Sequence, residues 1–558
     1  MVIPQDELKK IIIDTGLTDD KGFAAIEVYA KNADIPLEDA LVEKNLITDE
    51  KLGVLIGDHL KVPYISLQKV SIAPDAFNIV PERIARKQKV IAFEKSDQGI
   101  KLAMANPSNK LVIELLEKKT GSKMLPYLAT DRDIYNTLYI YRKDLQKTID
   151  TILKEVSAAH ADFNDAPVEK MVDMIIKYAN QDKTSDIHIE PQEKSSLIRF
   201  RIDGVLHDVL VLPKNLHDQI ITRIKVLARL RTDEHLSAQD GKMRITLDEE
   251  NLDIRVSILP IVEGEKVVMR LLSTHAKMFS LLDLGMSEKD LKTVTKAFSR
   301  SFGMILSTGP TGSGKSTSIY SILKILNIRE KNITTVEDPV EYRLKGVNQI
   351  QVNVKTNLTF ANGLRSILRQ DPNIVFVGEI RDNETAGIAI NAALTGHLVL
   401  STLHTNDAAT TLPRLIDMKI EPFLVASTIN VIIAQRLIRR ICEMCKSSYT
   451  VVRDQMVLNL GEETTKKHFG DKPELRIYKG AGCKICHFTG YAGRVGLFEV
   501  LEVTARLKKL ILDKEESDVI GKAAVEDGMN TMLDDGLQKV IKGVTTIEEV
   551  LRATKVES

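Results

Sequence analysis

Residues 303–327 read GMILSTGPTGSGKSTSIYSILKILN, an apolar strand, a glycine-rich loop and a helix in that order. The loop, GPTGSGKST, fits the pattern G-x-x-x-x-G-K-[ST], in which backbone N–H groups turn inward onto phosphate groups. The partial positive charge at the start of the following helix adds to this attraction. Because the strand and the helix both stand where the motif requires them, the stretch predicts a phosphate-binding loop.

The residues of this loop divide the work of holding a nucleotide. Lys315 is expected to reach the β and γ phosphates, and the hydroxyl of Ser316 is expected to hold Mg²⁺. The predicted nucleotide-binding residues are Gly309, Pro310, Thr311, Gly312, Ser313, Gly314, Lys315, Ser316 and Thr317.

Hydrolysis requires a carboxylate near such a loop. The apolar strand of residues 373–379, NIVFVGE, ends in Glu379, and Gly378 stands where many nucleotide hydrolases have Asp. A second acidic stretch, EDPVE, follows another strand at residues 337–341. We infer that Glu379 positions Mg²⁺ through water and that Glu337 or Glu341 orients the attacking water. A solvated turn is the alternative interpretation of the second stretch.

Two histidines, His397 and His404, flank the next apolar strand. A single histidine is usually a structural residue, and that alternative stands for both. In open α/β sheets, however, ligands gather at the carboxyl ends of the strands. This rule favours a role for His404 at the nucleotide.

All four cysteines occur in two Cys-x-x-Cys pairs, Cys442 with Cys445 and Cys483 with Cys486. Four thiolates at this local spacing are typical of a tetrahedral Zn²⁺ site and leave no open position for water, so the predicted zinc is structural. A redox pair is the alternative, and two pairs without a third cysteine argue against it. The long gap between the pairs predicts a small lobe that the metal ties at its base.

Composition excludes several classes of protein. The 558 residues include 77 Lys and Arg against 77 Asp and Glu, and this zero net charge argues against a protein that coats nucleic acid. No apolar run approaches the roughly 18 residues of a membrane span. The first residues, MVIPQDELKK, lack an export signal. Any membrane role is therefore expected to be peripheral.

The chain is expected to be a multidomain α/β protein whose main domain has a parallel sheet, because its strands are apolar throughout and must be buried on both faces. Asp186, His188 and Glu190 fall on one face of a predicted strand. We interpret them as a polar face at a domain interface, with a metal site as the alternative. The expected segments are a small helical region at 1–66, an α/β domain at 67–146, a linker at 147–166, an α+β domain at 167–280 and the phosphate-loop domain at 281–558, with the cysteine lobe at 442–490.

Several motifs together resemble the type II secretion and type IV pilus assembly ATPases, a family of hexameric motors. They are SDIHIEP (185–191), GPTGSGKST (309–317), VEDPVEY (336–342), ILRQDPNIVFVGEIRD (367–382), TGHLVLSTLHTNDA (395–408), AQRLIRRICEMC (434–445) and GVTTIEEVLR (543–552). The resemblance runs from about residue 70 to 555 and implies a RecA-like P-loop core that binds ATP and Mg²⁺.

The resemblance also implies roles and partners. Arg255 and Arg270, in the α+β domain, match family arginines that reach the nucleotide phosphates. The acidic stretch at 336–342 matches the aspartate box, Glu379 the Walker B element, and His397 to His404 the histidine box. The family works as a homohexamer in the cytoplasm, held at the inner face of the membrane by a platform protein and cytoplasmic assembly components.

The chain departs from the family at two places. Residues 235–241 read HLSAQDG where relatives have a basic pair before Pro-Gln-Asp-Gly, and we expect this to weaken or reroute one contact between domains. A weak repeat in residues 1–66 is similar to a degenerate form of a module that binds cyclic di-GMP in some relatives. Asn45 replaces a glycine and the glutamines are missing, so that ligand is not predicted.

The cysteine lobe and the long N-terminal part are typical of an assembly or export motor, since retraction motors lack both. We favour pilus extension, because the extra helical segment fits it, and keep the type II secretion ATPase as the alternative. A nucleotide-gated scaffold and a DNA-translocating motor are further alternatives. The acidic residues argue against the scaffold, and the zero net charge without a basic aromatic groove argues against the DNA motor.

Overall fold

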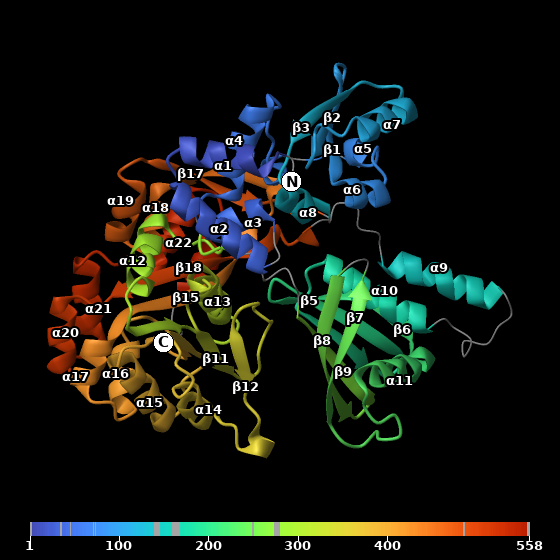
Figure 1. Cartoon of the computed structure of the whole chain (residues 1–558). Helices are drawn as coiled ribbons and strands as arrows, with labels where there is room; N and C mark the ends of the chain where they lie inside the picture. The colour runs from blue at the N-terminus through green and yellow to red at the C-terminus, as the bar shows by residue number, and fades with distance from the viewer. Residues whose placement is uncertain are drawn as a thin grey trace. The chain divides into compact units, whose positions relative to one another are not determined.

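The computed structural model describes residues 3–33, 36–44, 46–70, 72, 74–138, 145–158, 168–247, 250–272, 280–483 and 486–554. It divides into two compact units, one of residues 1–135 and 278–558 and one of residues 136–277 (Figure 1). The predicted linker at 147–166 begins within the helix α9 (Leu145–Ala158) of the second unit, and the rest of it lies outside the described residues.

The N-terminal part of the first unit begins with four helices around a small apolar core that includes Leu8, Phe23 and Leu41. The helices are α1 (Gln5–Asp14), α2 (Asp20–Ala33), α3 (Leu37–Glu43) and α4 (Asp49–Leu60). They are short and amphipathic, so their stability comes from packing apolar faces together rather than from each helix alone.

A small α/β segment follows, as the sequence predicts. Its sheet has the order β1-β2-β3, with β1 antiparallel and β3 parallel to β2, and α7 forms the crossover between the two parallel strands. The strands are β1 (Val90–Ser96), β2 (Gly99–Met104) and β3 (Met124–Leu128), and the helices are α5 (Pro74–Phe77), α6 (Glu82–Gln88), α7 (Lys110–Thr120) and α8 (Asp131–Thr137).

The second unit is the predicted α+β domain. Its six-stranded sheet has the order β6-β5-β4-β9-β8-β7 with antiparallel neighbours, and apolar residues such as Ile187 and Phe200 pack against the helices. The strands are β4 (Asp186–Pro191), β5 (Ser195–Ile202), β6 (Val205–Pro213), β7 (Gln239–Leu247), β8 (Glu250–Ile261) and β9 (Gly264–Leu272). The helices that follow α9 are α10 (Val168–Gln181) and α11 (His217–Ala228).

The hairpin predicted at Asp203-Gly204 is present and joins β5 to β6. Both turn residues have positive φ, 50° and 87°, as a two-residue turn of the primed type requires. This turn fixes the register in which Ile202 lies opposite Val205.

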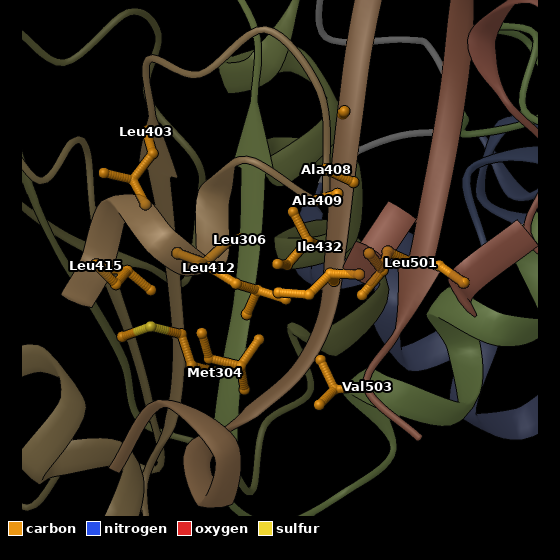
Figure 2. Close-up of a cluster of buried hydrophobic side chains, with 14 of the residues drawn as sticks. Met304, Leu306, Leu403, Ala408, Ala409, Leu412, Leu415, Ile432, Leu501 and Val503 are labelled. Atoms are coloured by element: carbon orange, nitrogen blue, oxygen red, sulfur yellow. The ribbon is translucent and has the colours of Figure 1, made fainter. Parts of the chain in front are cut away.

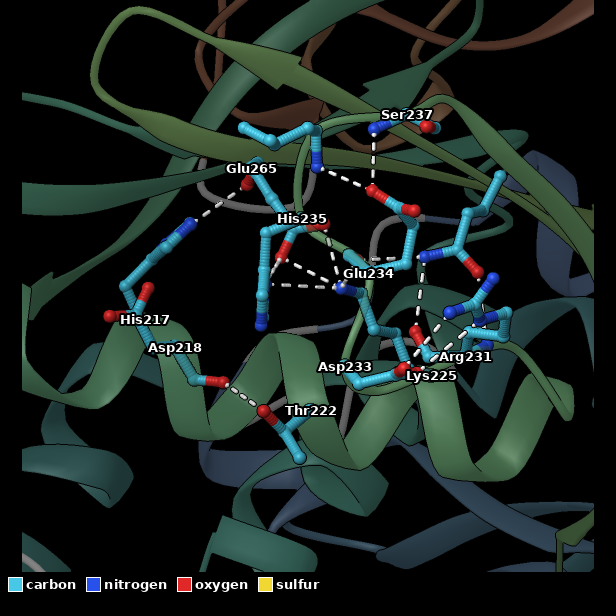
Figure 3. A network of polar contacts seen from close by, with 12 residues as sticks. His217, Asp218, Thr222, Lys225, Arg231, Asp233, Glu234, His235, Ser237 and Glu265 are labelled. Carbon is cyan, nitrogen blue, oxygen red and sulfur yellow. Dashed lines mark hydrogen bonds and ion pairs between the residues drawn. The ribbon is translucent and has the colours of Figure 1, made fainter.

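A buried lysine anchors the start of residues 235–241, the segment HLSAQDG singled out in the sequence as departing from the family pattern (Figure 3). The ammonium of Lys225, which has no exposed surface, donates to the carbonyl of Glu234 at 2.7 Å and to the carboxylate of Glu265 at 2.9 Å. His235, the first residue of the departing segment, lies 2.8 Å from the same carboxylate through its Nδ1. Within its own unit, therefore, this segment is held to strand β9 through Glu265.

The main sheet of the first unit has seven strands in the order β12-β11-β13-β14-β10-β15-β18. The predicted parallel sheet is confirmed for six of them, and β18 adds an antiparallel edge beside β15. The strands are β10 (Gly303–Thr308), β11 (Ile333–Glu337), β12 (Asn348–Gln351), β13 (Ile374–Val377), β14 (Leu398–Leu403), β15 (Ile429–Ile441) and β18 (Tyr491–Glu502).

Helices cover both faces of this sheet, which explains why its central strands are apolar throughout. In β10, Met304 and Leu306 enter one core (Figure 2), whereas Ile305 between them enters the core on the opposite face. The covering helices are α12 (Glu288–Phe298), α13 (Lys315–Leu326), α14 (Phe360–Ile367), α15 (Asn383–Leu394), α16 (Thr411–Asp417), α17 (Pro422–Thr428), α20 (Ala505–Leu512), α21 (Ser517–Glu526), α22 (Met532–Ile541) and α23 (Ile547–Thr554).

The insert between β15 and β18 is a small lobe that packs on the C-terminal helices. Its apolar residues Leu475 and Ile477 join the core of the main sheet, and His468 bonds to Asp534 of α22 at 2.7 Å. Its elements are β16 (Lys446–Val452), α18 (Arg453–Leu460), α19 (Glu462–Phe469) and β17 (Glu474–Gly480), with β16 antiparallel to β17. The lobe is thus held along its length as well as at its cysteine base.

Candidate active site

The phosphate loop connects β10 to α13 through a backbone shape that glycine adopts at little cost. Gly309, Gly312 and Gly314 have φ of 142°, 79° and 90°, values that strain residues with a Cβ. Helix α13 begins at the next residue, Lys315, so its unpaired N–H groups face the loop. The local structure therefore has the anion-binding form that the sequence predicts.

The side chain of Lys315 is folded over this loop. Its ammonium donates to the carbonyls of Gly309 at 2.8 Å and Pro310 at 3.0 Å, and the residue is 8% exposed. Burial lowers the pKa of Lys315, and the negative charge of Glu379 opposes that shift. The same carboxylate is therefore close enough to act on the lysine electrostatically.

Glu379 stands just beyond the end of β13, at the carboxyl edge of the sheet. Its carboxylate is mostly buried and is bracketed by Arg381 at 2.6 Å and by the imidazole of His404 at 3.3 Å. A Cβ on Gly378 would lie 3.2 Å from the Cα of Glu337 on the neighbouring strand. A side chain there would require the neighbouring backbone to shift by a few tenths of an ångström, so the close approach favours a glycine before Glu379.

The structure separates the two glutamates that the sequence left equivalent. Glu337 is 3% exposed and accepts hydrogen bonds from Tyr320 of α13, from Thr335 and from Gln349. Burial raises the pKa of Glu337, and these hydrogen bonds oppose the shift. Glu341, by contrast, is exposed. Glu337 is thus built into the contact between β11 and the phosphate-loop helix, whereas Glu341 is accessible to water.

The two histidines lie at opposite ends of β14. His404 follows the strand and reaches Glu379, whereas His397 precedes it and bonds through its ring to the carbonyl of Ala392 at 3.1 Å. Since β14 has six residues and runs parallel to β10, the two histidines are on the order of 20 Å apart. The structure brings His404 to the phosphate-loop edge and does not bring His397 there.

Arg255 and Arg270 lie side by side in the second unit, on the neighbouring strands β8 and β9. Asp186 of β4 is opposite Arg270 and holds its guanidinium at 2.8 Å. Lys242 of β7 is opposite Arg255 and extends the row of cations.

Asp186, His188 and Glu190 all lie on β4, at alternate positions, and the place of this face at a domain interface stays a prediction. Asp186 pairs with Arg270, and Glu190 pairs with Arg199 at 2.7 Å. Among the residues that the structure describes, the four cysteines are the one group of three or more potential metal ligands.

The sulfur atoms of Cys442, Cys445, Cys483 and Cys486 all lie within 4.8 Å of one another. Three of the distances are 3.9 Å (442 to 483), 3.8 Å (445 to 486) and 3.7 Å (483 to 486). Four thiolates bound to one zinc at about 2.3 Å would be about 3.8 Å apart in a tetrahedron. The donor set and its spacing therefore fit a structural zinc ion.

Backbone N–H groups point at these sulfurs. Gly482 donates to Cys445 at 3.3 Å, and Gly490 donates to Cys486 at 3.3 Å. Gly480 and Gly490 lie so close together that a Cβ on Gly480 would be 2.0 Å from the carbonyl oxygen of Gly490. The glycines around the second cysteine pair thus allow the chain to wrap tightly around the four thiols.

The fold and the site together define a nucleotide hydrolase of the P-loop class. Residues 161–552 match the sequence profile of the family described as Type II/IV secretion system protein, and this range covers the phosphate loop, both acidic stretches and the four cysteines. The chain belongs to this family. The predicted membership among the secretion and pilus ATPases is confirmed, and the chain is an ATPase of that family.

Individual relatives agree with this assignment. The chain is 39% identical over 532 residues to the type IV pilus assembly ATPase PilB of Myxococcus xanthus, covering 92% of this chain and 93% of that one. It is 46% identical over 394 residues to the type II secretion system protein E of Pseudomonas aeruginosa, covering 71% and 77%. The solved structure of the ATPase DotB of Yersinia pseudotuberculosis, at 20% identity, aligns with a TM-score of 0.51 over 69% of this chain and 93% of that one, and bears on the fold alone.

A second profile, named the MshEN domain, matches residues 60–139. It covers the three-stranded α/β segment rather than the helices of residues 1–66, in which we noted a weak repeat. The absence of a cyclic di-GMP ligand stays a prediction. Within the described residues, none of the helices combines the length and the apolar character that crossing a membrane requires.

Proposed function

We propose that the chain is a cytoplasmic, Mg²⁺-dependent ATPase motor that works as a homohexamer and drives pilin polymerisation in type IV pilus assembly. The extent of the match carries the pilus assignment, since pilus assembly relatives align with 92 to 98% of the chain and type II secretion relatives with 71 to 86%. The higher identity to the latter, 46% against 39%, keeps type II secretion as the alternative.

The roles at the nucleotide follow from the carboxyl edge of the main sheet. The loop of residues 309–317 holds the phosphates, with the charge of Lys315 on the β and γ groups. Ser316 would hold Mg²⁺ directly and Glu379 through water, and the ion supplies positive charge that offsets the charge developing during transfer. His404 and Arg381 support this proposal because they fix the direction of the Glu379 carboxylate.

The attacking water is oriented by Glu341, which is exposed, rather than by Glu337, whose oxygens are already occupied by three donors. Arg255 and Arg270 neutralise phosphate charge from the second unit. Their adjacency on β8 and β9 supports a shared target, because two guanidinium groups side by side can both donate to one phosphate chain, and Arg270 also pairs with Asp186.

Hexamer formation is supported by the family and by this division of the site. When one unit holds the phosphate loop and another the arginines, nucleotide turnover can be coupled to their relative rotation. A ring of such pairs can move a membrane platform protein, with cytoplasmic assembly components docked around it. The four cysteines hold Zn²⁺, which contributes to folding of the lobe rather than to catalysis.

The decisive experiment is to replace Lys315 with Ala in the full-length protein. Steady-state ATP turnover is expected to fall to background, because the charge on the phosphates is lost. Lys296→Ala is the matched control, since Lys296 is an exposed lysine of α12 that pairs with Glu502. Turnover of Lys315→Ala within about threefold of the parent would refute the assignment, since even a tenfold loss is only about 1.4 kcal/mol of barrier.

Cells that carry Lys315→Ala distinguish the alternatives. Loss of surface pili with normal protein secretion supports pilus extension, and the reverse result supports type II secretion. Turnover that rises when the membrane platform protein is added supports a motor. A scaffold would hydrolyse ATP too slowly to show this rise, and a DNA-translocating motor would respond to DNA instead.

A further inference from the structure

Gln435 lies directly behind the phosphate loop, on a strand outside the sequence motif. It is the residue after Ala434 in β15, and Ala434 is paired with Thr308, the last residue before the loop. The side chain of Gln435 is 2% exposed. A buried amide at this position must find hydrogen-bond partners inside the protein.

The amide finds its main partner in the loop itself. Its Nε2 donates to the carbonyl of Ser313 at 2.7 Å, and its Oε1 lies 3.5 Å from the hydroxyl of Ser307 in β10. A Cβ on Gly314 would lie 3.0 Å from the same Nε2, and a Cβ on Gly309 would lie 2.3 Å from the backbone carbonyl oxygen of Gln435. Two of the motif's glycines therefore make room for this one residue.

The bond to Ser313 determines where the next N–H group points. The carbonyl of Ser313 and the N–H of Gly314 belong to one planar trans peptide, so they point in opposite directions. With the carbonyl held toward β15, the N–H must point away from it. Gln435 and Leu437 occupy the β15 side of Gly314, so this N–H points away from the side that they fill.

We propose that Gln435 is a positioning residue for nucleotide binding, which aims the N–H of Gly314 at the bound phosphates by holding the carbonyl of Ser313. This inference rests on the proposed role of the loop in holding a nucleotide. The residue touches no substrate, and its effect passes entirely through one peptide group.

A neutral donor is needed for this task. Methionine would fill nearly the same volume without a donor and would leave a buried carbonyl without this hydrogen bond. An ionised glutamate would place negative charge against that carbonyl and behind a phosphate site. A protonated glutamate, however, carries one O–H donor and can make the same bond.

Gln435→Met in the full-length protein is the first test, with ADP affinity measured by calorimetry. The dissociation constant is expected to rise about tenfold or more, because a hydrogen bond to a charged phosphate is misdirected. Asn430→Leu is the matched control. Asn430 is a buried amide at the start of the same strand, and it donates to the carbonyl of Phe302 at 3.1 Å. This bond lies at the amino end of the strands, opposite the end that carries the phosphate loop. Both variants are expected to melt at lower temperature, but Asn430→Leu should bind ADP within about twofold of the parent.

Gln435→Glu gives a readout that a purely structural role would not produce. At each pH, the ADP affinity of this variant is divided by that of the parent. The ratio is expected to rise as the pH falls from about 8 to about 6. Burial raises the pKa of a carboxyl, and the protonated form restores the hydrogen-bond donor. This response decides the question if Gln435→Met fails to fold. A flat ratio, or equal loss of affinity in Gln435→Met and Asn430→Leu, would overturn the proposal. Lys315→Ala separates the two proposals. Unaltered ADP binding in Lys315→Ala contradicts the role of the loop. If Lys315→Ala loses ADP binding and Gln435→Met binds ADP normally, only the role of Gln435 is contradicted.

Discussion

The imidazole Nε2 of His404 lies 3.3 Å from the Oε2 of Glu379. The two residues leave neighbouring parallel strands, β14 and β13, at the edge where the phosphate loop leaves β10. The other carboxylate oxygen of Glu379 is 2.6 Å from Arg381. The direction of this carboxylate is therefore set by two side chains and by the sheet.

Glu379→Gln is expected to keep nucleotide affinity and to lose ATP turnover by at least about a hundredfold, on the order of 2.7 kcal/mol of barrier. The amide preserves the shape of the side chain and removes its charge. Affinity is measured by calorimetry beside phosphate release. If affinity falls together with turnover, Glu379 has a structural role and the catalytic carboxylate is Glu341 or Glu337.

The two glutamates of the acidic stretch should respond differently to the same change. Glu341→Gln is expected to lower turnover at least tenfold with an unchanged melting temperature, because Glu341 is exposed. Glu337→Gln should lower the melting temperature, because its new NH₂ group would replace an acceptor oxygen and face either Tyr320 on one side or Gln349 on the other in a buried site. Equal melting temperatures for the two variants would contradict this separation.

Much of the fold could be predicted because its signals are local. The continuous apolar strands indicated burial on both faces, and Asp203-Gly204 indicated a hairpin. The order of strands and the antiparallel edge strand β18 could not be predicted in this way, because pairing between distant strands depends on tertiary packing. Residues 446–480 lie between the two cysteine pairs and contain the paired strands β16 and β17, and nothing local indicated that the lobe also packs on α22.

The site was predictable where its residues belong to a motif and less so where they act through packing. The loop of residues 309–317 and the four cysteines are grouped as the spacing indicated. Tyr320 and Gln435 were missed, because a single polar residue in an apolar helix or strand does not reveal its partner. The sequence could have excluded His397 from the nucleotide site, since a residue that precedes a parallel strand lies at the amino edge of the sheet, away from bound ligands.

Stability should fall in acid through a buried carboxylate of the C-terminal helix α23. Glu549 of α23 is 2% exposed, and although burial alone would raise its pKa, hydrogen bonds from Arg439 and Arg552 lower it to about 2 from 4.5. Because the pKa is lower in the folded chain than in the unfolded one, the stabilisation is present above about pH 4.5 and is lost as the pH falls toward about 2.

Glu549→Gln should therefore lose on the order of 2 kcal/mol of stability at neutral pH and show a shallower decline in acid. The measurement is the urea midpoint of parent and variant between about pH 6 and pH 3. Asp534, whose pKa is also lowered to about 2, contributes to the decline in both proteins, so only the difference between them reports on Glu549. Parallel curves would show that the ion pairs of Glu549 do not contribute.

Arg255→Ala and Arg270→Ala are each expected to lower turnover at least tenfold while leaving the fold intact. Both side chains lie on the polar face of the sheet, and Arg270 is 63% exposed. Arg244→Ala is the matched control, because Arg244 is an exposed arginine of the same sheet that pairs with Asp253.

Turnover per chain should also rise with protein concentration, and ATP analogues should promote hexamers in light scattering. A monomer that is fully active at every concentration would contradict the motor.

Metal analysis of the purified protein should give about one zinc per chain, because three of the sulfur–sulfur distances, 3.7 to 3.9 Å, match those of four thiolates around one Zn²⁺. Cys483→Ser should lower the melting temperature and the zinc content together, since a site of this kind contributes folding energy directly. Arg476→Ala, on the exposed side of β17, is the control within the lobe and should keep its zinc. Native protein without metal and with four titratable thiols would contradict the zinc site, and the lobe would then be held by its packing on α22 alone.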